Sequence, residues 1–450
     1  MSAKSDRRGF IKAVGLGAAS LAMPGCLGAA LRTSKKARAD KPNIILILAD
    51  DLGYECLGCY GCASYKTPVL DELAATGIRF EHAYSQPLCT PSRLKIMTGR
   101  CNSRNYTYFG AMSPKEKTFG HLMQGAGYAT CIVGKWQLAA RDGGEGTYPK
   151  AAGFDEHCLW QVDDRGSRYR DPIIVENGKS REDLKGRYGP DVFAEYALDF
   201  IERKKDEPFF LYYPMTLTHA PFEPTPDTEE WKKGTTKANK KHFADMVAYM
   251  DTIIGRIVGK LEEIGLRENT LILFTGDNGT GVGIATRMKD GNVIKGGKGD
   301  TTDAGTHVAL IANWKGKIRS GKVCSDIVDF SDIVPTIAEA AGTTVSWEID
   351  GRSFLPQIFG QRGNPREWIY TWYRRNPPDT LYRFARDQRW KLYDEGDYPR
   401  AGKLFDVSSD ILEEKPVDPD SSEQAKSAYK KLHAAIDSMK PNETGGLSPR

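Results

Sequence analysis

Unbroken apolar runs recur along the chain, separated by polar segments, glycine and proline. The clearest are residues 43–49 (NIILILA), 270–275 (TLILFT) and 208–214 (PFFLYYP). Runs of this kind predict strands that are buried on both faces, as in a parallel sheet. Shorter runs at residues 129–133 and 307–312 predict further strands of the same sheet.

Between these runs, apolar residues recur every three or four positions, which predicts amphipathic helices. The pattern covers residues 69–76, 92–98, 117–126, 191–204 and 240–264. Strands that alternate with helices predict an α/β fold with a doubly wound, mostly parallel sheet. In such folds, ligands gather at the carboxyl ends of the strands.

The pattern changes after about residue 360. Short aromatic segments at 368–373, 382–386 and 390–393 predict strands, and residues 420–440 predict a charged amphipathic helix. We therefore expect residues 40–360 to form the large α/β domain and residues 361–450 to form a small α+β C-terminal subdomain.

The first 39 residues are expected to be an export signal. Residues 6–12 (DRRGFIK) resemble a twin-arginine signal, and the weakly apolar run at 13–23 is too short to span a bilayer. Ala37-Arg38-Ala39 offers a cleavage site, and Cys26 offers lipid anchoring as an alternative. The predicted location is periplasmic or extracellular, reached through the twin-arginine export machinery.

Charge gives no support to a nucleic-acid partner. The chain of 450 residues has a formal net charge of +4, with 27% charged and 40% hydrophobic residues, as in soluble globular proteins. Eight Lys and Arg and one Asp lie within the first 39 residues, so the remaining 55 basic and 58 acidic residues give −3. Anion binding must therefore come from a local basic pocket.

Nine cysteines leave an odd one after pairing. Cys56, Cys59 and Cys62 have the spacing of an iron–sulfur motif, but the next cysteine is Cys89, too far along the chain for a fourth ligand at close spacing. An oxidising compartment would permit disulfides, whose pairing the sequence leaves open, among Cys56, Cys62, Cys101, Cys131, Cys158 and Cys324.

Residues 87–93 (PLCTPSR) have the composition of a helix start, because Ser, Thr and Pro favour the first helical positions. The unpaired N–H groups there create a positive field that attracts anions. The string Cys89-Thr90-Pro91-Ser92-Arg93 resembles the Cys-x-Pro-x-Arg signature of sulfatases. Residues 67–74, 77–80 and 98–100 also follow that family's pattern. The resemblance is to type I sulfatases of the alkaline-phosphatase-like superfamily, and it covers roughly residues 41–415.

This resemblance implies a calcium ion and a modified cysteine. A formylglycine-generating maturation enzyme would convert Cys89 to an aldehyde, whose hydrate is the nucleophile and completes the metal shell. Asp50 and Asp51 end one predicted strand, and Asp277 and Asn278 end another. The resemblance makes these four residues calcium ligands, and oxygen donors do suit a hard cation. Asn278, where related zinc phosphatases place His, favours one calcium over two zincs.

The same resemblance assigns the residues that contact sulfate. Lys135 matches the family's Gly-Lys-Trp motif, His219 its His-x-Pro-Phe motif, and Lys298 a third sulfate contact, while Arg93 would hold the aldehyde hydrate. Cations suit this site because charge develops on the sulfuryl oxygens during cleavage. A near-neutral pKa would let His219 act as general acid toward the leaving alcohol.

Gln137 is the main departure from the family's Gly-Lys-Trp-His-Leu-Gly string. It can hydrogen-bond substrate but cannot replace a histidine base, a loss that typically costs roughly 10²–10⁴ in rate. Asp303, Ala304 and His307 are milder departures near Lys298.

The expected activity is that of a sulfuric ester hydrolase acting on a sulfated carbohydrate or a similar small ester. Gln137 keeps open an inactive pseudo-sulfatase that binds sulfated glycans, and the superfamily keeps open a phosphatase or phosphotransferase. Residues 141–185 and 222–240 are expected to wall the pocket, with Trp372 or Tyr373 as a surface for sugar stacking.

Overall fold

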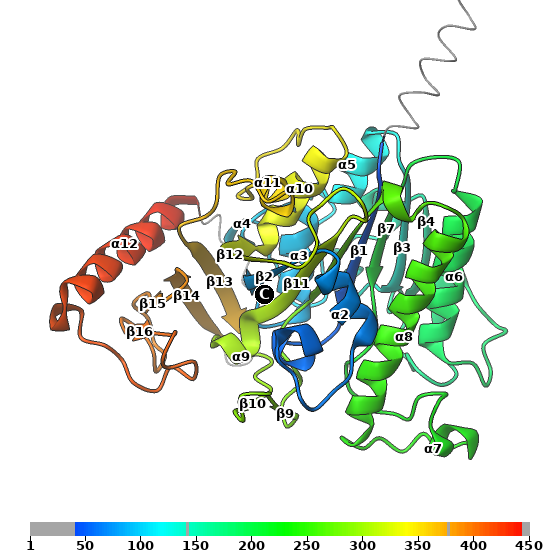
Figure 1. The fold of residues 1–450 in the computed structure, drawn as a ribbon, viewed down its shortest axis with the longest axis horizontal. Helices are drawn as coiled ribbons and strands as arrows, with labels where there is room; N and C mark the ends of the chain where they lie inside the picture. The colour runs from blue at the N-terminus through cyan, green and yellow to red at the C-terminus, as the bar shows by residue number, and fades with distance from the viewer. Residues whose placement is uncertain (1–40, 141–143, 376–378, 443–450) are drawn as a thin grey trace, which may run out of the picture. The chain divides into compact units, whose positions relative to one another are not determined.

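A ten-stranded sheet forms the centre of the chain in this computed structural model, which describes residues 41–140, 144–375 and 379–442 (Figure 1). The strands lie in the order β12 (Lys322–Asp329), β2 (Ile78–Tyr84), β11 (His307–Asn313), β8 (Thr270–Gly276), β1 (Asn43–Ala49), β7 (Phe209–Pro214), β3 (Ala129–Lys135), β4 (Glu156–Trp160), β5 (Ile174–Glu176) and β6 (Lys179–Ser180).

The middle of this sheet is parallel, as the sequence predicts. Strands β8, β1, β7, β3 and β4 pair in parallel, whereas β11 runs antiparallel between β8 and β2. Alternate side chains of β1 enter two separate hydrophobic clusters, one containing Ile44 and Leu46 and the other Ile45 and Ile47. Burial on both faces explains why this strand is an unbroken apolar run.

Helices cover both faces of the sheet, which confirms the doubly wound α/β prediction (Figure 1). Residues of α2 (Pro68–Ala75), α6 (Gly189–Arg203) and α8 (His242–Glu263) share the cluster of Ile45. On the other side lie α3 (Cys89–Thr98), α5 (Phe119–Gly125) and α10 (Ile333–Ala340). The shorter elements are α4 (Asn102–Asn105), α7 (Glu229–Lys232), α9 (Asp303–Thr306), α11 (Leu355–Ile358), β9 (Ala285–Arg287) and β10 (Val293–Lys295).

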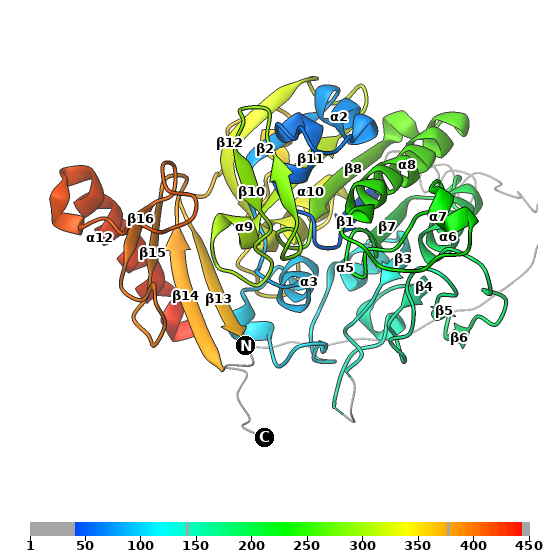
Figure 2. The ribbon, with the colours of Figure 1, turned by 90° about the horizontal axis from the view of Figure 1, so that it is seen from below.

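A second, antiparallel sheet forms the small C-terminal subdomain (Figure 2). Its strands β13 (Ile369–Arg375), β14 (Thr380–Arg386), β15 (Trp390–Tyr393) and β16 (Leu404–Asp406) are followed by α12 (Glu423–Met439). Apolar residues of this sheet and of α12 belong to the same cluster as Leu94 and Ile337. The subdomain therefore shares its core with one face of the large sheet. A boundary near residue 360 stays a prediction.

The described residues also bear on the cysteines and on membrane-spanning segments. The eight cysteines in the described ranges are free thiols, so none of the disulfides that the sequence permitted is formed there. The export signal and Cys26 lie outside the described residues. Within the part of the chain that the structure covers, no helix is both long enough and apolar enough to cross a bilayer.

We predict that Asp251→Ala destabilises the fold. Asp251, on α8, is 2% exposed and accepts the Val69 and Leu70 backbone N–H groups, both at 2.9 Å. It thereby caps α2, whose own N-cap residue Thr67 makes no side-chain cap. Losing this acceptor leaves two helix N–H groups unpaired and should cost about 1–3 kcal/mol in chemical denaturation.

The neighbouring exposed Thr252 provides the control, because Thr252→Ala should change stability by no more than about 0.5 kcal/mol. An Asp251→Ala chain that unfolds at the same denaturant concentration as the unmodified chain would contradict this account of α2.

Candidate active site

The two acidic pairs, by which we mean Asp50-Asp51 and Asp277-Asn278, lie side by side because β1 and β8 are parallel neighbours. Ala49 pairs with Gly276 at the ends of these strands, so the residues that follow emerge at the same edge. The Asp51 backbone N–H donates to Asp277 Oδ1 at 3.0 Å, and Asn278 Nδ2 donates to Asp51 Oδ1 at 2.9 Å. The structure thus brings together the four predicted metal ligands.

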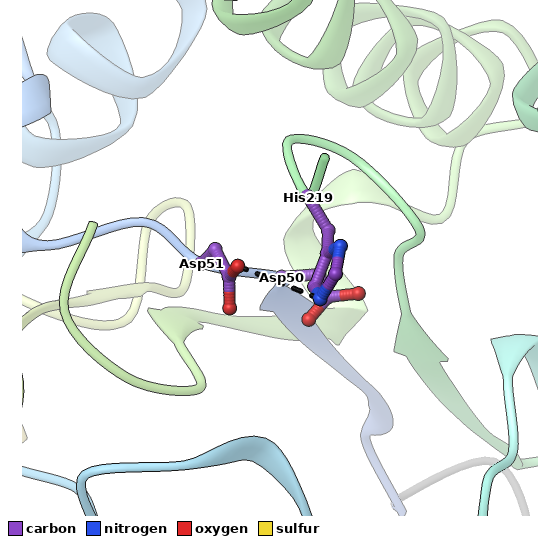
Figure 3. A group of neighbouring side chains, drawn as sticks. All are labelled: Asp50, Asp51 and His219. Atoms are coloured by element: carbon purple, nitrogen blue, oxygen red, sulfur yellow. Dashed lines mark ion pairs between the residues drawn. The ribbon is translucent and has the colours of Figure 1, made fainter. Parts of the chain in front are cut away.

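His219 joins this group from β7, the other neighbour of β1. Figure 3 shows its ring facing Asp51, and the His219 Nε2 to Asp51 Oδ2 distance is 3.6 Å. Ligand atoms of Asp50, Asp51 and His219 all lie within 4.8 Å of one another. The sequence did not predict that this histidine would adjoin the acidic pairs, since it follows a different strand.

Burial of these carboxylates has a large electrostatic effect. Burial itself, followed by repulsion from Asp50, raises the pKa of Asp277 to about 7. Burial also opposes the charge on Asp50, but the surrounding cationic groups, Lys135 first among them, together outweigh it and hold the pKa of Asp50 below its usual range. Asn278 Oδ1 is buried and has no hydrogen-bond donor among the described residues. Clustered acidic oxygens beside an unpaired amide oxygen fit a hard cation such as Ca²⁺.

Two lysines contact the acidic cluster directly. Lys135, the last residue of β3, places Nζ 2.9 Å from both carboxylate oxygens of Asp50. Lys298 Nζ lies 2.6 Å from Asp51 Oδ2 and 2.9 Å from His219 Nε2. Burial opposes the charged form of Lys298, yet the Asp51 carboxylate raises its pKa above the usual value.

Two arginines also contact the buried carboxylates. Arg93, on α3, lies 3.4 Å from Asp277 Oδ2 and donates to the Lys135 carbonyl at 3.1 Å. Arg168, which follows β4, lies 3.3 Å from Asp50 Oδ2. The sequence predicted Arg93 through its motif, whereas Arg168 belongs to no motif and was missed.

His219 is neutral in this setting. Its Nε2 accepts from the Lys298 ammonium, so the ring proton is on Nδ1, which donates to the Ala220 carbonyl at 2.5 Å. Burial lowers the pKa of His219 to about 4. The near-neutral pKa expected from the sequence is therefore wrong, and the proton nearest the pocket is on Lys298.

Cys89 is the first residue of α3, where the sequence predicted a helix start. The whole helix is buried, and Cys89 is 2% exposed. Gly99 ends the helix at φ 70°, a conformation that glycine adopts readily. Cys89 is the one residue of this helix among those that line the pocket described next.

That pocket has a volume of about 350 Å³, and its lining contains the predicted sulfate contacts Lys135, His219 and Lys298 but not Arg93, which was expected to hold the aldehyde hydrate. Gln137 lies on its wall with φ 65° and a buried Oε1 that has no hydrogen-bond partner in the described chain. The lining residues are Cys89, Tyr108, Phe109, Gly110, Lys135, Gln137, Ala139, Ala140, Gln161, Val162, Arg165, Arg168, His219 and Lys298.

The expected pocket walls are correct only in part. Residues 161–168 fall within the predicted 141–185 wall, but residues 222–240 do not line the pocket. Trp372 and Tyr373 are only 2% and 1% exposed, so they cannot offer a sugar-stacking face. Trp372 belongs to the hydrophobic cluster of Leu94, and the ring of Tyr373 stacks on that of Tyr382. The sequence analysis missed the wall at residues 108–110. Apart from the two aromatic residues Tyr108 and Phe109, this segment has no feature that would mark it as part of a pocket.

Comparisons with known proteins agree with this geometry. The sulfatase family model matches residues 42–343, and a model described as the C-terminal part of N-sulphoglucosamine sulphohydrolase matches residues 301–442. N-acetylgalactosamine-6-sulfatase of Canis lupus familiaris is 32% identical over 396 residues, covering 80% of this chain and 71% of that protein. Arylsulfatase A of Homo sapiens is 32% identical over 366 residues, covering 74% and 70%.

Among solved structures, Ps i-CgsB in complex with k-i-k-neocarrahexaose has a TM-score of 0.73 at 26% identity, covering 91% of this chain and 94% of that one. The parallel sheet, the acidic edge and the cysteine at a helix start thus occur together in a chain that matches the family along most of its length. The chain belongs to the sulfatase family, and its activity is that of a sulfuric ester hydrolase.

Proposed function

We propose that this chain hydrolyses sulfate esters of a sulfated carbohydrate, using formylglycine formed from Cys89 and a bound calcium ion. The pocket itself carries this proposal. It places Cys89 together with Lys135, His219 and Lys298, and none of its described lining residues is acidic. The sugar-active names among the relatives support a carbohydrate substrate.

Asp50, Asp51, Asp277 and the Oδ1 atom of Asn278 would hold the calcium ion, which would polarise the sulfuryl oxygens. The aldehyde at position 89 would supply a hydrated nucleophile in place of a thiol. Arg93 is positioned beside Asp277 and the Lys135 carbonyl, and its charge balances this part of the site.

Lys135 and Lys298 bind and orient the sulfate group through charge that is already in place before the reaction. When the alcohol leaves, its oxygen needs a proton. The Lys298 ammonium uses one N–H in its 2.9 Å hydrogen bond to His219 Nε2 and has two others, one of which can pass its proton to that oxygen. We propose that this pair supplies that proton, with His219 holding the donor in place. Gln137 contributes a hydrogen bond to the substrate.

A non-hydrolysing, glycan-binding protein is the second candidate. It is favoured by Gln137 alone, because an amide cannot accept a proton when sulfate is expelled. Export by the twin-arginine machinery, with maturation of Cys89 before export, remains our proposal from the sequence.

Mass spectrometry should find formylglycine in the peptide that spans Cys89 after co-expression with a maturation enzyme. Cys89→Ala should abolish sulfate release from an aryl sulfate while keeping the melting temperature near that of the unmodified chain. Cys324→Ala, at a partly exposed thiol outside the pocket, is the matched control and should remain active. Finding only thiol at position 89 in an active enzyme would overturn the formylglycine proposal.

Removal of calcium by a chelator should abolish activity and lower the melting temperature. Three buried carboxylates repel one another, and a bound cation relieves this repulsion. At a free calcium concentration 100 times the Kd, binding should add about 2.7 kcal/mol to the free energy of unfolding. Calcium should restore both properties. Asp277→Ala should remove the response of the melting temperature to the chelator. A chain whose activity and melting ignore chelation would contradict a metal at this edge.

Gln137→His should raise turnover and add an ionisation to the pH–rate profile. A positioned base typically contributes roughly 10²–10⁴ in rate. Because only the neutral imidazole accepts a proton, the added limb should show activity falling as the pH drops through the histidine pKa. Histidine tolerates the positive φ of this position better than most residues do.

Gln137→Asn is the matched control and should add no ionisation. An unchanged profile for Gln137→His would mean that another group or water already serves as the base.

A further inference from the structure

Two of the three arginines in the segment between β4 and β5 line the pocket, and the reaction described above does not use them. Arg165 and Arg168 both line the pocket, along with Gln161 and Val162. Lys135 and Lys298 already contact the carboxylates of Asp50 and Asp51 and serve the sulfate group. The pocket therefore holds more positive charge than a single sulfate ester requires.

Arg168 is buried and held in one orientation. Its guanidinium carbon lies 3.9 Å from the ring centre of Trp160, and the residue is 5% exposed. Its one polar contact among the described residues is the 3.3 Å approach of Nη1 to Asp50 Oδ2. A guanidinium has five N–H donors in a planar fork, and Nη1 is the one nitrogen of Arg168 with a hydrogen-bond partner among the described residues.

Arg165 lies three residues earlier and is exposed. It makes no hydrogen bond or ion pair within the described part of the chain. Asp163 and Asp164 precede it, but neither lines the pocket, and Asp163 accepts from the Tyr148 hydroxyl at 3.0 Å. The pocket also carries Phe109, 48% exposed, which offers an apolar ring surface.

We propose that Arg165 and Arg168 form a second anion subsite, which binds a carboxylate or an additional sulfate on the saccharide that carries the scissile ester, either on the reacting sugar or on the sugar joined to it. This rests on the proposed function in one respect, since the scissile sulfate is taken to lie over Cys89. The preferred substrates are then sugars with at least two negative charges. Planar forks that bind carboxylate and sulfate oxygens in pairs give arginine this selectivity.

Binding to the Cys89→Ala chain tests the subsite without turnover. Three probes share one reacting sugar: N-acetylgalactosamine 6-sulfate, its 4,6-disulfate, and the disaccharide in which glucuronate is joined to the 6-sulfate. Calorimetry should show that a second anion tightens binding by roughly tenfold at low salt, the range of a charge-assisted hydrogen bond. The two dianionic probes distinguish a sulfate from a carboxylate in the subsite.

Arg165→Gln in this background should remove most of that gain, whereas Arg165→Lys should keep part of it. Arg168→Lys keeps the charge but loses the fork and the stacking on Trp160, so it should also weaken the preference. Arg319→Gln removes an exposed arginine outside the pocket and is the charge-matched control. Melting temperatures show which variants fold, and exposed Arg165 keeps the test usable if Arg168 variants unfold.

In the matured enzyme, the ratio of kcat/KM between dianionic and monosulfated probes should fall roughly tenfold in Arg165→Gln, through KM more than kcat. Added salt should also reduce this ratio. The subsite is disproved if the unmodified chain shows no preference for a second anion, or if the preference survives both Arg165→Gln and Arg168→Gln.

The two proposals fail differently. If no probe and no aryl sulfate is hydrolysed, yet the Cys89→Ala chain binds dianionic sugars through Arg165, the hydrolase mechanism is wrong and the subsite stands. If sulfate is released without discrimination, the subsite is wrong and the hydrolase stands.

Discussion

Three carboxylates buried at one edge of the sheet impose the constraint around which the site is built. Unpaired charges in such a place are costly, and like charges so close together raise one another's proton affinity. Lys135, Lys298 and Arg93 each contact one carboxylate of this cluster. The family pattern assigns two of these cations, Lys135 and Lys298, to sulfate and the third, Arg93, to the aldehyde hydrate. The proposed chemistry therefore uses the same ion pairs that balance the buried charge, and breaking one buried pair leaves its partner uncompensated.

Close packing of the backbone lets these side chains converge. A Cβ on Gly134 would lie 2.2 Å from the Pro214 carbonyl oxygen, so only glycine permits β3 and β7 to approach there, just before Lys135 turns into the site. A Cβ on Gly279 would lie 1.9 Å from the Ala304 carbonyl oxygen, which allows the loop after Asn278 to contact the segment around α9. Both glycines stand beside functional residues because the site is assembled from several chain segments in little space.

The C-terminal subdomain supports the site through polar contacts as well as a shared core. Lys391 and Glu413 form an ion pair at 2.7 Å that is fully buried, and Lys391 also donates to the Thr301 carbonyl. Tyr393 contacts the Thr301 hydroxyl at 2.8 Å, and Arg386 pairs with Asp303. These contacts hold the segment that directly follows Lys298. The subdomain thus positions a residue of the pocket, a task that its aromatic, strand-like sequence does not reveal.

The sequence by itself determined most of the parallel core, because burial on two faces leaves an unbroken apolar run and burial on one face leaves a helical period. It did not reveal β4, β2, β12 or α10. It also located the acidic pairs at strand ends and Cys89 at a helix start, since capping residues and motif strings are local signals. Only the tertiary structure decided that β11 runs antiparallel, because an apolar run carries no direction. An aromatic residue in a strand can be buried or exposed, and its sequence context looks the same in both cases. Only the structure shows that Trp372 and Tyr373 are buried. Arg168 reached the pocket through folding alone: its partners Asp50 and Trp160 come from different strands, and no local pattern records their meeting.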